Sequence, residues 1–279
     1  MHTGFAFPHQ TNNTKNAQVP EDISNIFNSV FAVHLANSPE TVDEVFAVRY
    51  QVYCIDRPFE DPNCFADKRE HDEYDHRSAH ALIRHRVTSE SVAAVRLVMA
   101  GDTPDDIDFP MEGPCLPHMD RTAIRAIMQT PRNRVAEISR MAVSREFRRR
   151  LNEDKSTSGI SALACYSDAE KGKRAMPYIS LGLFSAILQM SIQHGITHWM
   201  AVMEPSQLRL LKRFGVEFDH VGPVLEYHGH RRPAFTEAAA LIKGIKKRRP
   251  DVWSLITDNG RHLPPKLDDD YKEREEAVA

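Results

Sequence analysis

The 279-residue sequence lacks the features that mark several classes of protein. Its four cysteines, Cys54, Cys64, Cys115 and Cys165, show no Cys-x-x-Cys spacing, so neither a zinc ribbon nor a disulfide framework is predicted. No run approaches the ~18 apolar residues of a membrane-spanning helix. The formal net charge is −3, which gives no basic field for a nucleic acid. We therefore expect a cytoplasmic protein with reduced thiols.

Fourteen histidines raise the question of a metal site. His71, His76, His228 and His230 cluster in pairs, but none has the spacing of a helical or zinc-finger ligand pair. No metal and no tightly bound cofactor are predicted.

The composition, 41% hydrophobic and 27% charged, fits one medium-sized α/β domain with extensions, or at most two domains. We expect a flexible arm over residues 1–22, a domain over 23–248 with an insertion at 151–176, and a partly disordered C-terminal extension over 249–279.

A buried strand with charges set into it is predicted over residues 135–143. Strict alternation places Glu137, Ser139, Met141 and Val143 on one face and Arg140 on the other. Charges in such a strand need partners, because burial of an unpaired charge is unfavourable. An edge strand with solvated charges is the alternative.

A helix is predicted over residues 39–54, capped by Ser38 and opened by Pro39. Its apolar stripe includes Val45 and Val52, and Arg49 falls in the same stripe. An arginine there either pairs with carboxylates or extends its head to water.

Carboxylates are available in the long loop at residues 55–78, which contains Asp72 and Asp75. The strands predicted at 79–87 and 92–99 form a hairpin, and the second carries Arg96. If these segments converge with the strand at 135–143, three arginines face three carboxylates, and such a cluster tolerates partial burial.

The remaining elements follow from apolar periodicity and from Pro and Gly punctuation. We expect a strand at 29–36, a helix at 121–129, a helix from Pro177 to Gly195, a strand at 197–203, a helix from Pro205, strands at 218–227 and 233–235, and helices at 236–247 and 251–256.

Four motifs in order resemble the autoinducer synthase branch of the GNAT acyltransferases. They are Arg49-Tyr-Gln-Val-Tyr53, Asp72-Glu-Tyr-Asp75, Arg96-Leu97 and Glu137-Ile-Ser139-Arg140. The sequence is similar above all to the N-acyl amino acid synthases and the PEP-CTERM/exosortase system-associated acyltransferases. The similarity covers residues 29–144, with a looser GNAT ending from Pro177 to about Phe235.

The resemblance implies a GNAT-like α/β (α+β) fold, with a mixed, mostly antiparallel sheet and helices on both faces. Two family features differ here. The tryptophan that the family has before the acidic motif is absent, with Phe59 or Phe65 as substitutes, which weakens the case for a lactone-forming substrate. The glycine-rich pyrophosphate loop after the fourth strand is also missing.

The missing glycine loop favours an acyl-phosphopantetheine thioester delivered by acyl carrier protein, with acyl-coenzyme A as the other donor. Carrier proteins present an acidic helix, and the basic patch predicted to meet it consists of Arg145, Arg148, Arg149 and Arg150. A solvated basic turn is the other interpretation of this patch.

The implied chemistry is attack of an amine on a thioester. Glu137 is the predicted base, and Ser139 would position a water or donate a hydrogen bond. Arg140 is given a structural or electrostatic role, because alternation points it away unless a bulge turns the strand. Backbone N–H groups near Met141 and Ala142 are the expected oxyanion donors.

The other charged residues have supporting roles in this prediction. Arg49, Asp72, Asp75 and Arg96 would order the acceptor pocket, and the arginines would lower the pKa of Glu137. Asp72 or Asp75 is therefore the alternative base. Candidates for an acyl slot, which are equally core residues, are Met141, Phe184, Trp199, Met200 and Met203.

The predicted activity is transfer of a long fatty acyl group from acyl carrier protein to the amino group of an amino acid or related amine, in a Gram-negative bacterium with exosortase or exopolysaccharide genes. Two alternatives stay open. One is an acyl-homoserine-lactone synthase that uses S-adenosylmethionine, and the other is a GNAT-fold module that only binds an acyl carrier or lipid.

Overall fold

The computed structural model describes residues 22–101, 109–145 and 178–264. Four predictions lie wholly or partly outside these residues: the arm up to residue 21, the basic residues Arg148, Arg149 and Arg150, the insertion at 151–176, and the C-terminal extension from residue 265 onward. The described residues form a seven-stranded sheet with the strand order β1-β2-β3-β4-β5-β7-β6. Every neighbouring pair is antiparallel except β4 and β5, which run parallel. The predicted α/β fold with a mixed, mostly antiparallel sheet is confirmed.

The strands have the following bounds: β1 Phe31–Leu35, β2 Ser78–His85, β3 Ser91–Met99, β4 Val135–Val143, β5 His198–Met203, β6 Leu225–Glu226 and β7 His230–Glu237. The helices are α1 Ile23–Val30, α2 Pro39–Tyr50, α3 Glu112–Cys115, α4 Arg121–Gln129, α7 Ile179–Gln193, α8 Pro205–Arg213, α9 Ala238–Arg248 and α10 Pro250–Thr257. A π-helical segment, Gln51–Asp56, continues α2, and the predicted helix at 39–54 spans both.

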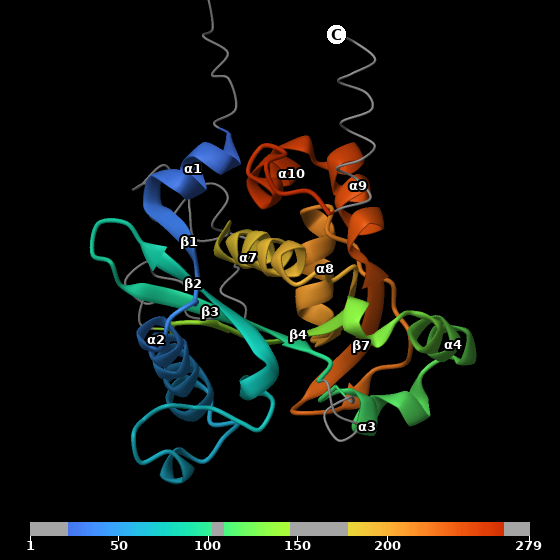
Figure 1. The fold of residues 1–279 in the computed structure, drawn as a ribbon, viewed down its shortest axis with the longest axis horizontal. Coiled ribbons are helices and arrows are strands. Elements are labelled where there is room, and N and C mark those ends of the chain that lie inside the picture. The colour runs from blue at the N-terminus through green and yellow to red at the C-terminus, as the bar shows by residue number, and fades with distance from the viewer. Residues whose placement is uncertain (1–21, 102–108, 146–177, 265–279) are drawn as a thin grey trace, which may run out of the picture.

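One face of the sheet carries the main apolar core. Helix α7 crosses this face and is itself covered by α10, and α1 lies against α10 (Figure 1). The side chains of α7 are buried on nearly every side of the helix, as expected for a helix that is packed on both sides. Gly182 lets α7 approach α1, because a Cβ there would lie 2.4 Å from the Phe27 ring. Val252, Leu255 and Ile256 of α10 belong to the same core.

The opposite face is divided. Helix α2 packs on β3 through a small apolar cluster that includes Val45, Val48 and Ala94. A second cluster, around Val98, Met111 and Ile127, joins the same face to α3 and α4. Arg96 lies between Ala94 and Val98 in β3, so a charged side chain separates the two clusters. The face that bears α2 therefore contains a polar gap at its centre.

The predicted order of elements is confirmed for most of the sheet, and two parts differ. Residues 23–30 form α1, so the predicted strand at 29–36 starts later, at Phe31. The strand predicted at 218–227 is reduced to β6 and an isolated bridge between His220 and Ala234. No helix among the described residues is long and apolar enough to cross a membrane.

Candidate active site

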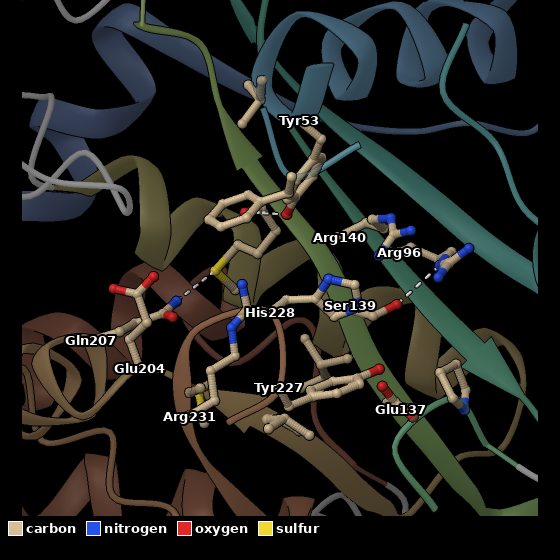
Figure 2. A pocket seen from close by; sticks show the side chains of 18 of the residues that line it. Tyr53, Arg96, Glu137, Ser139, Arg140, Glu204, Gln207, Tyr227, His228 and Arg231 are labelled. Carbon is tan, nitrogen blue, oxygen red and sulfur yellow. Dashed lines mark hydrogen bonds between the residues drawn. The ribbon is translucent and has the colours of Figure 1, made fainter. Parts of the chain in front are cut away.

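A pocket opens where β4 and β5 separate. Their parallel pairing runs from Val135 with His198 to Ile138 with Ala201 and goes no further. The following residues of both strands, Ser139–Met141 and Val202–Glu204, line the pocket instead (Figure 2). Its empty volume is about 1070 Å³, which includes the open mouth.

A bulge in β4 shapes the pocket wall. Ala94 pairs with Ala142 and Arg96 with Ser139, so β4 has one residue more than β3 between these pairs. Arg140 occupies this position with a φ of +47°, in the left-handed region. The alternation changes here, because Val143 packs in the main core with Ala136 and Ile138 while Ala142 packs under α2. The prediction that Val143 shares the face of Glu137 is wrong.

Arg49 is the centre of the charged cluster and is 0% exposed. Its Nε donates to Glu70 Oε2 at 2.6 Å, and its Nη1 donates to Asp75 Oδ1 at 2.6 Å. The arginine in the apolar stripe of α2 therefore pairs with carboxylates, as predicted, and is not solvated. Glu70 is a partner that the prediction did not name.

Arg96 connects the cluster to β4. Its Nη1 donates to Asp72 Oδ1 at 2.5 Å and to Asp75 Oδ1 at 3.0 Å. Its Nε donates to Ser139 Oγ at 2.9 Å. Ser139 is thereby held by a guanidinium on the pocket wall, as Figure 2 shows.

Arg140 also belongs to the cluster, because the bulge turns it toward the acids. Its Nε donates to Glu70 Oε1 at 3.1 Å, and its Nη2 donates to Asp72 Oδ2 at 3.2 Å and to Glu60 Oε1 at 3.3 Å. Strict alternation predicted that Arg140 points away from Glu137 unless a bulge turns the strand, and the structure contains this bulge. We call the set Arg49, Arg96, Arg140, Glu60, Glu70, Asp72 and Asp75 the arginine–carboxylate network.

The network holds its aspartates ionised. Burial opposes the charged form of Asp75, but the hydrogen bond and the charge of Arg49, with the charge of Arg96, lower its pKa well below the usual range. The pKa of Asp72 is lowered against burial by Arg96 and Arg140. His80, 3.7 Å from Asp75, is buried, and its burial lowers its pKa to about 4. Carboxylates engaged in this way are weak bases, which argues against Asp72 or Asp75 as the alternative base.

Glu137 lies beside the network but does not join it. The side chain is 3% exposed, and among the described residues its partner is the Met111 backbone N–H, which donates to Oε2 at 2.9 Å. Burial raises its pKa to about 7, although that hydrogen bond and the charge of Arg96 act in the opposite direction. The prediction of a lowered pKa for Glu137 is wrong, because desolvation outweighs the charges of Arg96 and Arg140. A carboxylate with this pKa suits proton transfer near neutral pH.

Two tyrosines that were not predicted as site residues line the pocket. In Figure 2 the Tyr227 ring lies beside Glu137, and burial with the nearby Glu137 charge raises its pKa to about 12. Tyr53 donates from its hydroxyl to the Met141 carbonyl oxygen at 3.2 Å. The sequence could have pointed to Tyr53, because it belongs to the first motif. Tyr227 follows the short strand β6, and no periodic pattern in the sequence marks it.

The candidates for the acyl slot separate into two groups. Met141 and Met203 line the pocket. Phe184 and Trp199 lie in the main core and Met200 in the second apolar cluster, so these three are packing residues. Of the expected oxyanion donors, Met141 lines the pocket, whereas Ala142 is buried and paired with Ala94 of β3.

Two aromatic residues had been considered for the place of the family tryptophan. Phe59 lines the pocket and lies 6.4 Å, between ring centroids, from Tyr53. Phe65 contacts Tyr50 and His71 and does not line the pocket. Of the two, Phe59 is therefore the residue at the pocket. Among the described residues no cluster of possible metal ligands is present.

Comparison with known proteins identifies the class. Residues 48–155 match the family described as "Acetyltransferase (GNAT) domain". No curated protein sequence matched the chain. Residues 48–155 therefore match a GNAT acetyltransferase domain, and this match supports an acyltransferase.

Several solved structures resemble this protein in fold. BjaI, a CoA-dependent acyl-homoserine lactone synthase solved with SAM and isopentyl-CoA, is 17% identical with a TM-score of 0.50 over 82% of this chain and 88% of that chain. FeeM, an N-acyl amino acid synthase from uncultured soil microbes, is 10% identical with a TM-score of 0.49 over 78% of this chain and 96% of that chain. The acyl-homoserine lactone (AHL) synthase LasI is 17% identical with a TM-score of 0.46 over 77% and 96%. The likeness to BjaI shows that the two proteins share a fold.

Proposed function

We propose that the protein transfers a long-chain fatty acyl group from a phosphopantetheine thioester to the amino group of an amino acid or related amine. The observation that carries this proposal is the position of Glu137. Its buried carboxyl, with a pKa of about 7, lies in a pocket between separated strands, and the same pocket has an apolar wall that includes Met141 and Met203. A base and an apolar channel in one pocket are what acylation of an amine requires.

In the proposed reaction, the Glu137 carboxylate takes a proton from the ammonium group of the acceptor. The freed nitrogen lone pair attacks the thioester carbonyl carbon, and the C–N bond forms as the oxygen becomes an oxyanion. The oxyanion then collapses, the C–S bond breaks, and the thiolate receives the proton from the Glu137 carboxyl. One further proton leaves the nitrogen to solvent, and the products are an amide and a free thiol.

The donor in this proposal is acyl carrier protein. The absence of a glycine-rich loop after β4 supports this donor, and so does the run of basic residues from Arg145 to Arg150. Of these residues, only Arg145 is described, and its backbone N–H donates to Asp56 Oδ2 at 2.8 Å. We also propose a bacterial setting with exosortase genes, on the resemblance alone.

An acyl-homoserine-lactone synthase is the second candidate. Phe59 at the pocket supports it, because an aromatic ring occupies the place expected for the family tryptophan. That enzyme would need the same base for the acylation step, so Glu137 does not distinguish the two candidates.

Mass spectrometry of lipids from cells that express the protein separates the candidates. N-acyl amino acids are expected from the wild-type protein and not from a Glu137→Gln variant expressed at the same level. Acyl lactones would favour the second candidate. No new lipid from either protein would favour a module that only binds its acyl ligand.

A further inference from the structure

Four arginines line the pocket, and they differ in whether a carboxylate neutralises them. Arg96 and Arg140 are paired within the arginine–carboxylate network. Arg57 and Arg231 make no ion pair with any described residue. The pocket therefore holds two guanidinium groups whose charge the surrounding described residues leave unpaired.

Arg231 enters the pocket from the hairpin that joins β6 and β7. The turn is made by His228 and Gly229, with φ values of +49° and +95°, and it brings Tyr227, His228 and Arg231 to the pocket together. Figure 2 shows Arg231 and His228 entering on the side away from the network. The Cζ atom of Arg231 lies 5.9 Å from the centroid of the Phe59 ring.

The Arg231 guanidinium lacks the hydrogen bonds that burial demands. Its Nε is buried and has no hydrogen-bond partner among the described residues. A half-buried cation without an anion is unfavourable unless a ligand supplies the charge. The planar fork of arginine fits a carboxylate with two parallel hydrogen bonds.

The two unpaired arginines have different charged neighbours. The charges that act on Arg57 are those of Glu204, Arg145 and Asp56. The charge of Arg231 instead lowers the pKa of Tyr227, whereas the charge of Glu137 raises it. In Figure 2 the Tyr227 side chain lies between Arg231 and Glu137.

We propose that Arg231, with the neighbouring imidazole of His228, binds the carboxylate of an amino-acid acceptor while the amino group of that acceptor meets Glu137. The inference rests on the proposed function and specifies its acceptor as an amine that carries an anion. The phosphate of a phosphopantetheine arm has similar chemistry, but it would approach from the side of Arg57 and Arg145.

A binding experiment tests this site without turnover. Isothermal titration calorimetry compares N-dodecanoylglycine with N-dodecanoylglycinamide, which differ in the carboxylate alone. The wild-type protein is expected to bind the carboxylate compound at least about tenfold more tightly, as a charge-assisted pair would provide. Arg231→Gln is expected to abolish this preference, and Arg231→Lys to keep part of it.

Two control variants distinguish the role of Arg231 from that of other arginines. Arg57→Gln is expected to keep the preference for the carboxylate and to weaken binding of 4′-phosphopantetheine. Arg125, exposed on α4, provides the matched control Arg125→Gln, which should change neither. Circular dichroism of each variant confirms that the fold is retained.

Three results would overturn the inference. They are equal or undetectable binding of the two glycine compounds to the wild-type protein, an unchanged preference in Arg231→Gln, and loss of phosphopantetheine binding alone in that variant. Because no acyl transfer is measured, a protein without N-acyltransferase activity gives a different pattern from one that lacks this subsite.

Discussion

The Glu137 carboxylate is held by the Met111 backbone N–H at 2.9 Å and by no arginine among the described residues, although Arg96 lines the same pocket. This relationship determines the chemistry of the site. Arginines paired with Glu70, Asp72 and Asp75 have their charge largely neutralised, so they cannot hold Glu137 ionised at low pH. Burial then decides the outcome and brings the pKa of Glu137 to about 7.

Replacement of Glu137 by Gln is expected to abolish transfer. We expect kcat to fall about 10²- to 10⁴-fold, the usual contribution of a general base. In the wild-type enzyme kcat/KM should rise with pH and level off above about 7, because the carboxylate is the active form. Steady-state assays across pH measure both effects, and retained turnover in the variant would remove Glu137 as base.

The same variant is expected to stabilise the fold at alkaline pH. The pKa of Glu137 is raised from 4.5 to about 7, so between these values the folded state binds more protons and stability falls as pH rises. At pH 8, Glu137→Gln should raise the free energy of unfolding by up to about 3 kcal/mol, and at pH 4 by nearly nothing. Urea denaturation at both pH values measures the change. Glu226→Gln, at an exposed position, is the control.

Replacement of Arg49 by Ala is expected to destabilise the protein by about 3–5 kcal/mol, because Glu70 and Asp75 would be left buried without their partner. Arg69→Ala provides the matched control. It removes an exposed pair with Asp43, which is worth about 0–1 kcal/mol. An equal midpoint of urea denaturation for wild type and Arg49→Ala would contradict a structural role for the network.

Acid should weaken the network in a defined direction. The pKa values of Asp72 and Asp75 are lowered, so their contribution to stability is complete above about 4, the unfolded value, and is lost as pH falls through the folded values. The wild-type protein should therefore lose stability on acidification below about pH 4, and Arg49→Ala should lose less over the same range. Equal losses would contradict this assignment.

The backbone conformation of the bulge predicts how replacements of Arg140 affect stability. Its φ of +47° suits glycine better than any residue with a Cβ. Arg140→Gly and Arg140→Ala both remove the guanidinium, but the glycine variant should be more stable by about 1 kcal/mol. Comparison of the two by urea denaturation tests the conformation itself. A less stable glycine variant would show that the bulge is not retained.

The basic patch yields a kinetic prediction. Reversal of charge at Arg148, Arg149 and Arg150 should raise KM for acyl carrier protein about tenfold at low salt, with a smaller change in kcat and a smaller effect at high salt. Reversal at Lys246 and Lys247, on α9, is the matched control. Equal KM values for the patch variant and wild type would leave these residues without a role in docking.

The sequence was sufficient to predict the network in outline. A cation in an apolar helical stripe, acids in a long loop and a second cation in a strand can be stable together only when they meet. Arg49, Arg96, Asp72 and Asp75 do meet. The periodic elements were also predictable, because α2, β3, β4 and α7 each carry a clear apolar pattern.

The rest depends on features that alternation and spacing do not encode. The bulge at Arg140 comes from a one-residue difference in register between two strands that lie about 40 residues apart in sequence. Glu70 and Asp72 both reach Arg140 through an irregular loop, and Tyr227 and Arg231 reach the pocket through a short hairpin. The pKa of Glu137 depends on burial by α3, a helix of four residues with little sequence signal.

The arginine–carboxylate network has a consequence for how this protein can vary. Each of its guanidinium groups binds more than one acid, and three of the acids, Glu70, Asp72 and Asp75, bind two arginines each. A single replacement therefore leaves several charged groups unpaired at once. A second replacement, at one of its partners, restores only part of the charge balance of the network. Homologues that keep this fold should therefore either retain all seven residues or replace all of them with uncharged side chains.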